Sequence, residues 1–302
     1  MPWQPLPYAP WSASRDTLHG HTQVLGKVAL ALAPPQPQLQ HGALRLTQRG
    51  WETAPLPAQD GSGTIGVTLD LRTHEAVVEH RDGRGSHVPL TPNRSVAEVT
   101  SDVLAAVREL AGDVAINMKP QETAWSTPLD EDTEHATYDV DQIAAYFDAA
   151  TCAATVLTEL RAPYRGRSTL VNAWWGGFDL AVSLFSGAPA APPAQDFIMR
   201  NSMDAQEIAV GWWPGDSRYP HAAFYAYAHP ADDGVRAIDL PVGRWDAALG
   251  EHILDWDDVV ASDDPHAAAL DFCRSFARNA CRVCGWEPAL AGTVDAVPPP
   301  VS

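Results

Sequence analysis

The chain has 302 residues, of which 45% are hydrophobic, and this is enough apolar side chain to bury a substantial core in one large domain or two smaller ones. Asp and Glu number 38 against 20 Lys and Arg, which gives a formal net charge of −18 at pH 7. Because nucleic acids and anionic membranes repel an acidic surface, this charge argues against both as partners.

The first half is predicted to start with an extended arm over residues 1–14, which are rich in Pro and Trp, followed by a short helix over residues 15–26. Apolar residues then alternate with polar ones, as they do in a half-buried β-strand. Four such segments predict strands over residues 28–32, 43–47, 64–71 and 76–80. An antiparallel sheet packed against helices is the expected arrangement of this half.

A helix and a linker are predicted to close the first half. Ser95 and Glu98 have the spacing of a capping box, in which each side chain satisfies a free N–H group at the start of a helix, and Gly112 marks the end of that helix. Residues 1–113 are therefore expected to form the first half. Residues 114–140 lack periodicity and are rich in Pro, Thr and acidic side chains, which is typical of a linker.

The second half, residues 141–287, is predicted to repeat this order of elements. An apolar stripe indicates a helix over residues 141–161. Four predicted strands follow, at residues 169–173, 178–185, 207–212 and 224–228. Asp264 followed by Pro265 is typical of a helix start, and this last helix is expected to reach Gly285.

The fold class that follows is α+β: two similar halves, each an antiparallel sheet of about four strands with flanking helices. Because both halves show the order helix, strands, helix, an internal duplication is expected. Two similar halves would meet about a pseudo-twofold axis, and the cleft between them is the natural place for a ligand. Residues 288–302 are expected to form a disordered tail.

Two aromatic segments beside predicted strands indicate the walls of a site. They are Trp174-Trp175-Gly176-Gly177 and Gly211-Trp212-Trp213-Pro214-Gly215. Paired tryptophans are costly to leave exposed, and neighbouring glycines allow a backbone or a ligand to approach closely. A core or a pocket wall satisfies both conditions, and we expect Trp175 and Trp213 to line one cleft. Tyr225 and Tyr227 alternate along a predicted strand, so both hydroxyls should face one side of it, whether toward a ligand or at the edge of the core.

Two carboxyl groups stand beside these aromatic segments. Asp179 lies in an otherwise apolar predicted strand, and Glu207 opens the strand that leads to the second tryptophan pair. A carboxyl group kept dry by indole rings has a raised pKa and can serve as a general acid. A buried ion pair, with Arg49 among the available cations, explains Asp179 equally well, and a surface strand end explains Glu207. With His135, these two carboxyls are the candidate catalytic residues.

Three polar residues, His19, Gln23 and Lys27, are spaced four apart and share one face of the first predicted helix, provided that the helix continues past Gly26. Such a face can bind an anion, while a polar stripe that caps the end of the helix explains the same spacing. His19 and His21 are two residues apart, which on a helix directs their side chains about 200° apart, so they form a poor metal pair.

Other motifs give no metal or cofactor site. The acidic run from Asp130 to Glu134, with His135, has side chains suited to a hard metal ion or to acid–base chemistry, but its spacing matches no metal loop and caps for the next helix explain it. Cys281 and Cys284 lack a second pair for zinc, so buried thiols in the last helix are expected. Motifs of the common hydrolases, NTPases, dehydrogenases and metalloproteases are absent from the sequence.

Short segments spread along nearly the whole chain form a recognisable pattern. They are Thr17-Leu18-His19, Thr22-Gln23, Gly26-Lys27, Arg49-Gly50, Asp130-Glu131-Asp132, Glu134-His135, Tyr138-Asp139, Trp175-Gly176, Phe178-Asp179-Leu180-Ala181, Trp213-Pro214-Gly215, and Phe224-Tyr225 with Tyr227. The pattern resembles a bacterial family of unknown function, number 5996 among the domains of unknown function. His21 and Gly177 depart from it, since the family has Trp and Ser there. The resemblance implies a shared architecture and brings no activity, cofactor or catalytic residue.

Binding of a small molecule in a Trp- and Tyr-lined cleft between the halves is the leading functional hypothesis. The candidate ligand-binding residues are His19, Gln23, Lys27, Arg49, Trp175, Asp179, Trp213 and Tyr225. One alternative is an enzyme, a hydrolase or an isomerase, that uses Asp179 or Glu207 in acid–base chemistry. Another is a protein-interaction or self-association module in which the tryptophans form a surface patch.

The remaining expectations concern partners and location. No apolar stretch approaches the length of a membrane helix, and the first residues lack the basic-then-apolar order of a secretory signal. A cytoplasmic protein, monomeric or homodimeric, is therefore expected. Its predicted partner is an unidentified small molecule, with no cofactor, no metal, no nucleic acid and no membrane.

Overall fold

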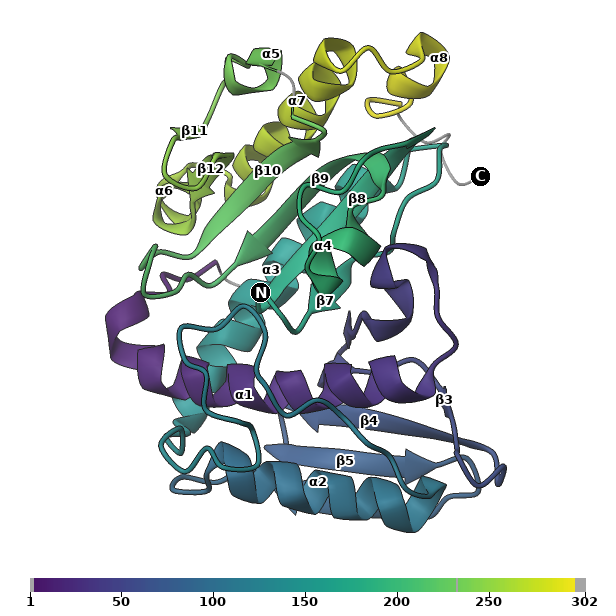
Figure 1. Cartoon of the computed structure of the whole chain (residues 1–302). Helices are drawn as coiled ribbons and strands as arrows, with labels where there is room; N and C mark the ends of the chain where they lie inside the picture. The colour runs from purple at the N-terminus through teal and green to yellow at the C-terminus, as the bar shows by residue number, and fades with distance from the viewer. Residues whose placement is uncertain (1–2, 232, 297–302) are drawn as a thin grey trace, which may run out of the picture.

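The computed structural model describes residues 3–231 and 233–296. It combines helices with two antiparallel sheets, which confirms the predicted α+β class with two sheet-containing halves (Figure 1). Each sheet has six strands instead of about four. The additional strands are two to five residues long, too short for an alternating pattern to reveal them.

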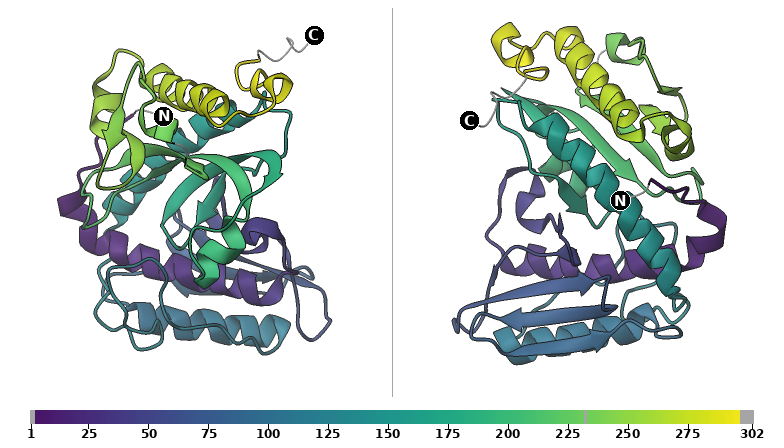
Figure 2. Two further views of the ribbon diagram at one scale, coloured as in Figure 1. Left: turned by 45° about the horizontal axis from the view of Figure 1, so that its top comes forward. Right: turned by 180° about the vertical axis from the view of Figure 1, so that it is seen from behind.

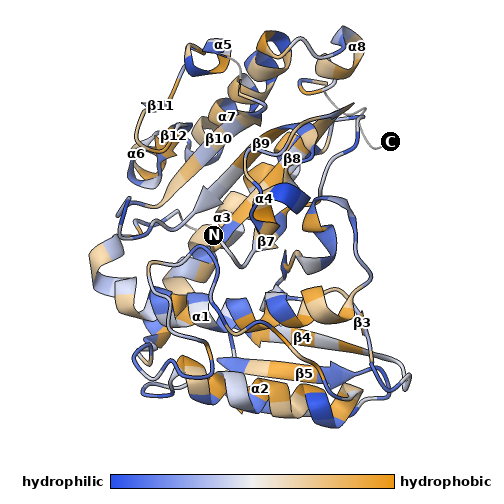
Figure 3. Cartoon of the chain, in the orientation of Figure 1, coloured by the Kyte–Doolittle hydropathy of each residue, from blue (hydrophilic) through white to orange (hydrophobic). Residues whose placement is uncertain are grey.

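The first sheet is a meander in the order β1-β2-β4-β5-β6, with the short strand β3 paired to β4. Its strands are β1 (Arg45–Leu46), β2 (Gly50–Glu52), β3 (Leu56–Pro57), β4 (Thr64–Asp70), β5 (Glu75–His80) and β6 (Gly85–Pro89). Helix α2 (Val96–Ala111) follows, and the predicted capping box is present, since Ser95 accepts from the Glu98 N–H and the Glu98 carboxylate accepts from the Ser95 N–H. In Figure 3, α2 alternates between orange and blue, because one face packs and the other is in solvent.

The second sheet is also antiparallel, in the order β7-β8-β9-β10-β12-β11, so β7 to β10 form a meander and β12 lies between β10 and β11. Its strands are β7 (Asn172–Trp174), β8 (Asp179–Pro189), β9 (Ala205–Trp213), β10 (Ala223–His229), β11 (Arg244–Asp246) and β12 (Glu251–Asp255). Helix α3 (Val140–Arg161) precedes the sheet and α7 (Pro265–Val283) follows it. The shorter helices are α4 (Phe197–Ser202), α5 (Asp233–Arg236), α6 (Trp256–Ala261) and α8 (Pro288–Ala291).

Three predictions about the first 32 residues were wrong, because helix α1 extends from Tyr8 to Leu32. The arm over residues 1–14 gives way to helix at Tyr8, the helix does not stop at Gly26, and residues 28–32 are its last turns instead of a strand. The helix crosses the middle of the molecule between the first sheet and the second half (Figure 1), and nearly all its residues from Ser14 to Ala29 are buried. A helix that is buried on most sides has no solvent-exposed polar face. Its sequence therefore lacks the periodic alternation of polar and apolar residues that identifies a surface helix.

Helices cover one face of each sheet. The view from behind in Figure 2 shows the first sheet in front of α1 and α2, which lie side by side on its far face. Helices α3 and α7 pack on each other and on β8, β9 and β10 of the second sheet. The two sheets join at their first strands, where Leu44 and Ala173 exchange two backbone hydrogen bonds of 3.1 and 2.9 Å.

Two further expectations need correction. Residues 288–302 were expected to be disordered from their start, but Pro288–Ala291 form α8 and Val294 is buried; residues 297–302 lie outside the described part. Helix α3 is long and apolar enough to cross a membrane by length and composition, contrary to the expectation that no stretch would be. Half of its apolar window is buried in the fold against the second sheet and α7.

Candidate functional site

The face of the second sheet opposite α3 and α7 lines a cavity of about 730 Å³. Residues of β8, β9, β10 and β12 form its floor, α4 and the 3-10 helix η1 (Pro37–Gly42) contribute to its walls, and the segment that contains Glu122 reaches its edge. We call it the aromatic cavity after the rings that line it: Trp174, Trp175, Trp213, Tyr219, Tyr225 and Tyr227. Its volume is typical of sites that bind a small organic molecule.

Strand alternation separates the cavity from the core. On one face of the sheet, Leu180, Val210 and Trp212 are fully buried in the hydrophobic core that includes α3 and α7. Their neighbours along the same strands point the other way, so Asp179 and Trp213 face the cavity. The two tryptophan pairs differ. Trp212 is a core residue while Trp213 lines the cavity, whereas Trp174 of β7 and Trp175 of the turn after it both line the cavity.

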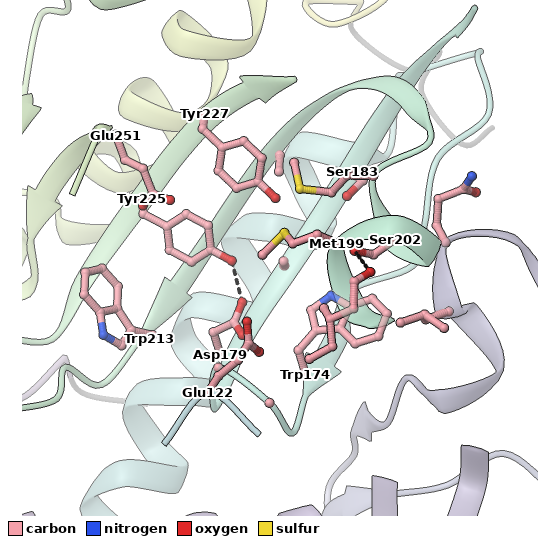
Figure 4. Close-up of a pocket in the computed structure, with 18 of the residues that line it drawn as sticks. Glu122, Trp174, Asp179, Ser183, Met199, Ser202, Trp213, Tyr225, Tyr227 and Glu251 are labelled. Carbon is pink, nitrogen blue, oxygen red and sulfur yellow. Dashed lines mark hydrogen bonds between the residues drawn. The ribbon is translucent and has the colours of Figure 1, made fainter. Parts of the chain in front are cut away.

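Tyr225 and Asp179 are joined across the sheet by a short hydrogen bond in which the tyrosine hydroxyl donates to the carboxylate (Figure 4). Gly211 of β9 lies between them, because it pairs with Ala181 of β8 on one side and with Tyr225 of β10 on the other. A Cβ at Gly211 would overlap the Tyr225 ring. The missing side chain therefore lets this ring lie flat over β9 and reach Asp179.

Three carboxyl groups on this face have pKa values near neutrality. Burial raises the pKa of Asp179 to about 7; the hydrogen bond from Tyr225 opposes this rise, and the nearby Glu122 and Glu251 add to it. Burial likewise raises the pKa of Glu207 to about 7, opposed by a hydrogen bond from Ser183 and by Arg167, and the pKa of Glu251 to about 7, with Asp246 adding to the rise. These groups change charge within the physiological pH range.

Glu122 adds a fourth carboxyl group from the segment between the two halves. Its backbone has φ of +54°, unusual for a residue with a side chain, and its carboxylate lies over Gly176, where a Cβ would collide with it. Glu122 is an exposed residue at the edge of the cavity, but protein atoms lie around its carboxyl group, and this burial raises the pKa of Glu122. Glu122, Gly177, Asp216 and Arg218 also line an adjoining hollow of about 300 Å³.

The polar stripe His19, Gln23 and Lys27 does share one face of α1, but it lies behind the cavity wall. The Gln23 side chain donates to the carbonyls of Gln121 and Trp175 and accepts from the Gln121 N–H, and His19 Nε2 lies 3.0 and 2.9 Å from the carbonyls of Trp175 and Gly176. Burial lowers the pKa of His19 to about 3, so its ring is neutral. These residues hold the Glu122 segment and the Trp175 turn in place.

Lys27 does not cap the helix, because α1 continues past it to Leu32. Its ammonium group donates to the carbonyl of Lys119 at 2.8 Å and lies 5.2 Å from the centre of the Trp175 ring. Burial lowers the pKa of Lys27 to about 8. Lys27 thus supports the outer side of the Trp175 ring, while the other side of that residue lines the cavity.

Arg49 and His135 lie elsewhere. Arg49 Nε donates to Asp70 at 3.0 Å in the first sheet, so it is not the partner of Asp179. His135 Nδ1 lies 2.8 Å from Asp132 Oδ2, and the carbonyls of both residues accept backbone N–H groups at the start of α2. Of the predicted ligand-binding residues, the lining of the aromatic cavity includes Trp175, Asp179, Trp213 and Tyr225.

Sequence reasoning missed three groups that line the cavity. Glu251 stands in β12, a short strand without a periodic signal, and Glu122 stands in a segment without regular structure. Tyr227 was recognised as facing the side of Tyr225 but not named as a binding residue. The alternation of residues along β10 was the signal that placed Tyr227 on this face. The sequence around Glu122 and Glu251 contains no comparable signal.

The arrangement offers carboxyl groups and tyrosine hydroxyls around an aromatic space. Among the residues that the structure describes, no group of three or more His, Cys, Asp and Glu side chains is placed to hold a metal ion. Within the same residues, Arg218 is the one basic side chain in the lining, and its guanidinium donates to Asp216 Oδ2 at 2.6 and 3.1 Å. The cavity can therefore donate and accept hydrogen bonds, stack on flat or apolar groups and attract positive charge.

The comparisons with known proteins identify the family but no function. Residues 3–292 match the family described as Family of unknown function (DUF5996), and the chain belongs to this family. No curated protein and no solved structure matches the chain.

Proposed function

We propose that this DUF5996 protein binds a small organic molecule in the aromatic cavity. The observation that supports the proposal is a space of about 730 Å³ walled by Trp174, Trp175, Trp213, Tyr219, Tyr225 and Tyr227. Large aromatic side chains normally fill space in a folded protein, and rings that instead surround a void present stacking surfaces to a ligand. Carboxyl groups and hydroxyls at fixed positions around the void supply orientation.

Ligand-observed NMR with a library of small metabolites and fragments tests the proposal. Binders should lose their saturation-transfer signal in Trp213→Ala and keep it in Trp245→Ala. Trp245 is a matched control, because it is also a partly buried tryptophan on a strand of the second sheet but lies outside the cavity lining. Binding that survives Trp213→Ala, or the absence of any binder, would count against the proposal.

Acid–base catalysis in the same cavity is the second candidate. The observation that favours it is the hydrogen bond between Tyr225 and Asp179 together with the pKa of about 7 for that carboxyl, which suits proton transfer at neutral pH. Glu207 is not its catalytic partner, because it pairs with Phe185, which lies six positions after Asp179 along β8. This places the α-carbons of Asp179 and Glu207 about 20 Å apart. An enzyme would lose turnover but keep ligand binding in Asp179→Asn.

The third hypothesis, a surface tryptophan patch for association, has no support of this kind. The tryptophans of the two pairs lie in the core or along the cavity. The large hydrophobic side chains that are exposed in the described part of the chain are Val140 on α3, Leu170 in the segment before β7, and Phe197 on α4, so they lie on separate parts of the chain.

A further inference from the structure

The charges around the aromatic cavity are unbalanced. Asp179, Glu207 and Glu251 stand on three different strands, and Glu122 faces them from the segment between the halves. Asp216 neutralises the guanidinium of Arg218, and no other basic residue in the described chain is part of the lining. Taking carboxylates out of water without a counter-charge is costly, so a structure that gathers them around a void favours a cation there.

Two unused polar groups point to a ligand independently of the charge. The Tyr227 side chain, enclosed by protein, directs its hydroxyl into the cavity (Figure 4), and no described residue accepts or donates a hydrogen bond there. The carboxyl group of Glu251, directly across from Tyr227 in the continued register of β10 and β12, also has no hydrogen-bond partner in the described chain. Both groups border the open space of the cavity, and a ligand that donates hydrogen bonds would satisfy both.

The carboxyl groups are spread out instead of converging. Asp179 and Glu207 lie near opposite ends of the sheet face, about 20 Å apart at their α-carbons, and Glu251 lies on a third strand. Aromatic rings fill the stretch between them: Trp213 is next to Tyr225, with ring centres 5.8 Å apart, and Tyr225 stacks on Tyr227 at 6.3 Å. Aromatic faces attract organic cations and the methylene groups beside them.

We propose that the ligand of the aromatic cavity is an extended organic cation, a linear diamine or polyamine. Its ammonium groups would donate to the separated carboxylates and to the Tyr227 hydroxyl, and its methylene chain would lie along the rings of Trp213, Tyr225 and Tyr227. This inference rests on the proposed function, because it specifies which kind of small molecule occupies the cavity.

Calorimetric titration with spermidine, putrescine and 1,8-octanediol tests the inference. The diol is a neutral chain with two polar ends, so it separates a demand for charge from a demand for shape. We expect spermidine to bind with 1:1 stoichiometry and at least tenfold more tightly than the diol. Equal binding of diol and amines would overturn the cation inference but leave small-molecule binding intact, whereas binding of neither, with no hit in the NMR screen, would overturn both.

Nonspecific attraction is the main competing explanation, since a protein with net charge −18 attracts polycations over its whole surface. The variant Asp179→Asn/Glu207→Gln/Glu251→Gln should weaken spermidine binding at least tenfold. The control Glu52→Gln/Asp257→Asn/Asp258→Asn removes the same charge outside the cavity and should change it less than twofold. Trp213→Ala, which keeps every charge, should also weaken it several-fold. Equal losses in both triple variants would overturn the inference.

Proton release provides a second readout that does not depend on a variant folding. Asp179 faces Tyr225, Glu122 and Glu251; Glu251 faces Asp246; Glu207 faces Ser183, Arg167 and Asp204. A bound cation stabilises the ionised carboxylates, so protons leave the site on binding. At pH 6.5, the observed enthalpy should change with the ionisation enthalpy of the buffer, in the direction of proton release, and affinity should rise between pH 6 and pH 8. A pH-independent affinity without proton release would contradict the inference.

Discussion

The pKa values of carboxyl groups shift in opposite directions in the two sheets. In the first, Asp70 of β4 accepts from Arg49 Nε and from the N–H groups of Arg72 and Thr73; burial alone would raise its pKa, but these bonds outweigh burial and lower it. In the second, burial raises the pKa of Asp179 to about 7, and its one hydrogen bond comes from a neutral tyrosine. Both sheets are six-stranded and antiparallel and have helices packed on one face, so the architecture does not decide this difference.

The difference separates a structural role from a functional one. A carboxylate that is paired where it is buried contributes to stability, as Asp70 does. Carboxyl groups around a void with raised pKa values reduce the stability of the empty protein when they ionise, and the proposed ligand would offset that loss. The sign of the pKa shift thus distinguishes the paired carboxylate Asp70 in the first sheet from the carboxyl groups of the proposed site in the second sheet.

Exchanging the carboxylate of Asp70 for an amide should give the largest effect. The Asp70 side chain is 4% exposed. Asp70→Asn removes the negative charge that Arg49 and Arg72 face, and it weakens the two hydrogen bonds that the carboxylate accepts from backbone N–H groups. We expect a loss of about 3 kcal/mol in the free energy of unfolding at pH 7, measured by urea denaturation. A loss below 0.5 kcal/mol would show that the first sheet does not depend on this pair.

The opposite sign is expected for Glu207→Gln in the second sheet. The folded protein holds the Glu207 proton with a pKa of about 7 against 4.5 in the unfolded chain, so wild-type stability falls as the pH rises from about 4.5 to 7 and stays lower above it. Since the amide cannot ionise, the variant should exceed the wild type in stability by about 3 kcal/mol at pH 8 and match it near pH 4. Denaturation curves at both pH values measure this; destabilisation at pH 8 would remove the contrast between the sheets.

The contact that connects the halves should give an intermediate effect. Gln23→Ala breaks the bonds of α1 to Gln121 and Trp175, and leaves buried backbone groups unpaired. We expect a loss of about 1–2 kcal/mol in the free energy of unfolding, the usual cost of leaving buried hydrogen-bonding groups unpaired. We also expect faster hydrogen exchange in residues 119–122, the segment that positions the Glu122 side chain. Gln36→Ala, at an exposed glutamine, is the control. Unchanged exchange in residues 119–122 would show that other contacts hold this segment.

The sequence predicts the elements whose signals are local. Helix α2 has its capping box, α7 begins at Asp264 and Pro265 as predicted, and the long strands β4 and β5 have alternation over six or seven residues. Only residues 15–26 of helix α1 were predicted as helix, because burial on most sides leaves α1 without a solvent-exposed polar face. Strands β2, β3, β11 and β12 were missed because they are too short to show an alternating pattern. Element order therefore follows from sequence, but the layers do not.

The site was partly predictable for the same reason. Trp175, Trp213, Asp179 and Tyr225 lie beside glycines or in alternating strands, so their shared face can be inferred. Glu122 comes to the cavity only because α1 holds its segment there, which no local pattern encodes. Both halves have strands between a first and a last long helix, but the second half also has the short helices α4 and α5 between its strands. The internal duplication stays a prediction.

The smallest effect is expected from one methyl group placed in each sheet. At Gly211 of β9 a Cβ overlaps the Tyr225 ring, so Gly211→Ala should displace the ring, cost about 1 kcal/mol and weaken its hydrogen bond to Asp179. Because that bond lowers the pKa of Asp179, its loss should raise this pKa further, which carboxyl ¹³C NMR titration measures. Gly66 of β4 has open space where a Cβ would stand, so Gly66→Ala should be neutral or slightly stabilising and leave Asp179 unchanged. Equal responses in the two variants would mean that Gly211 is an ordinary strand glycine and that Tyr225 does not need it to reach the carboxylate.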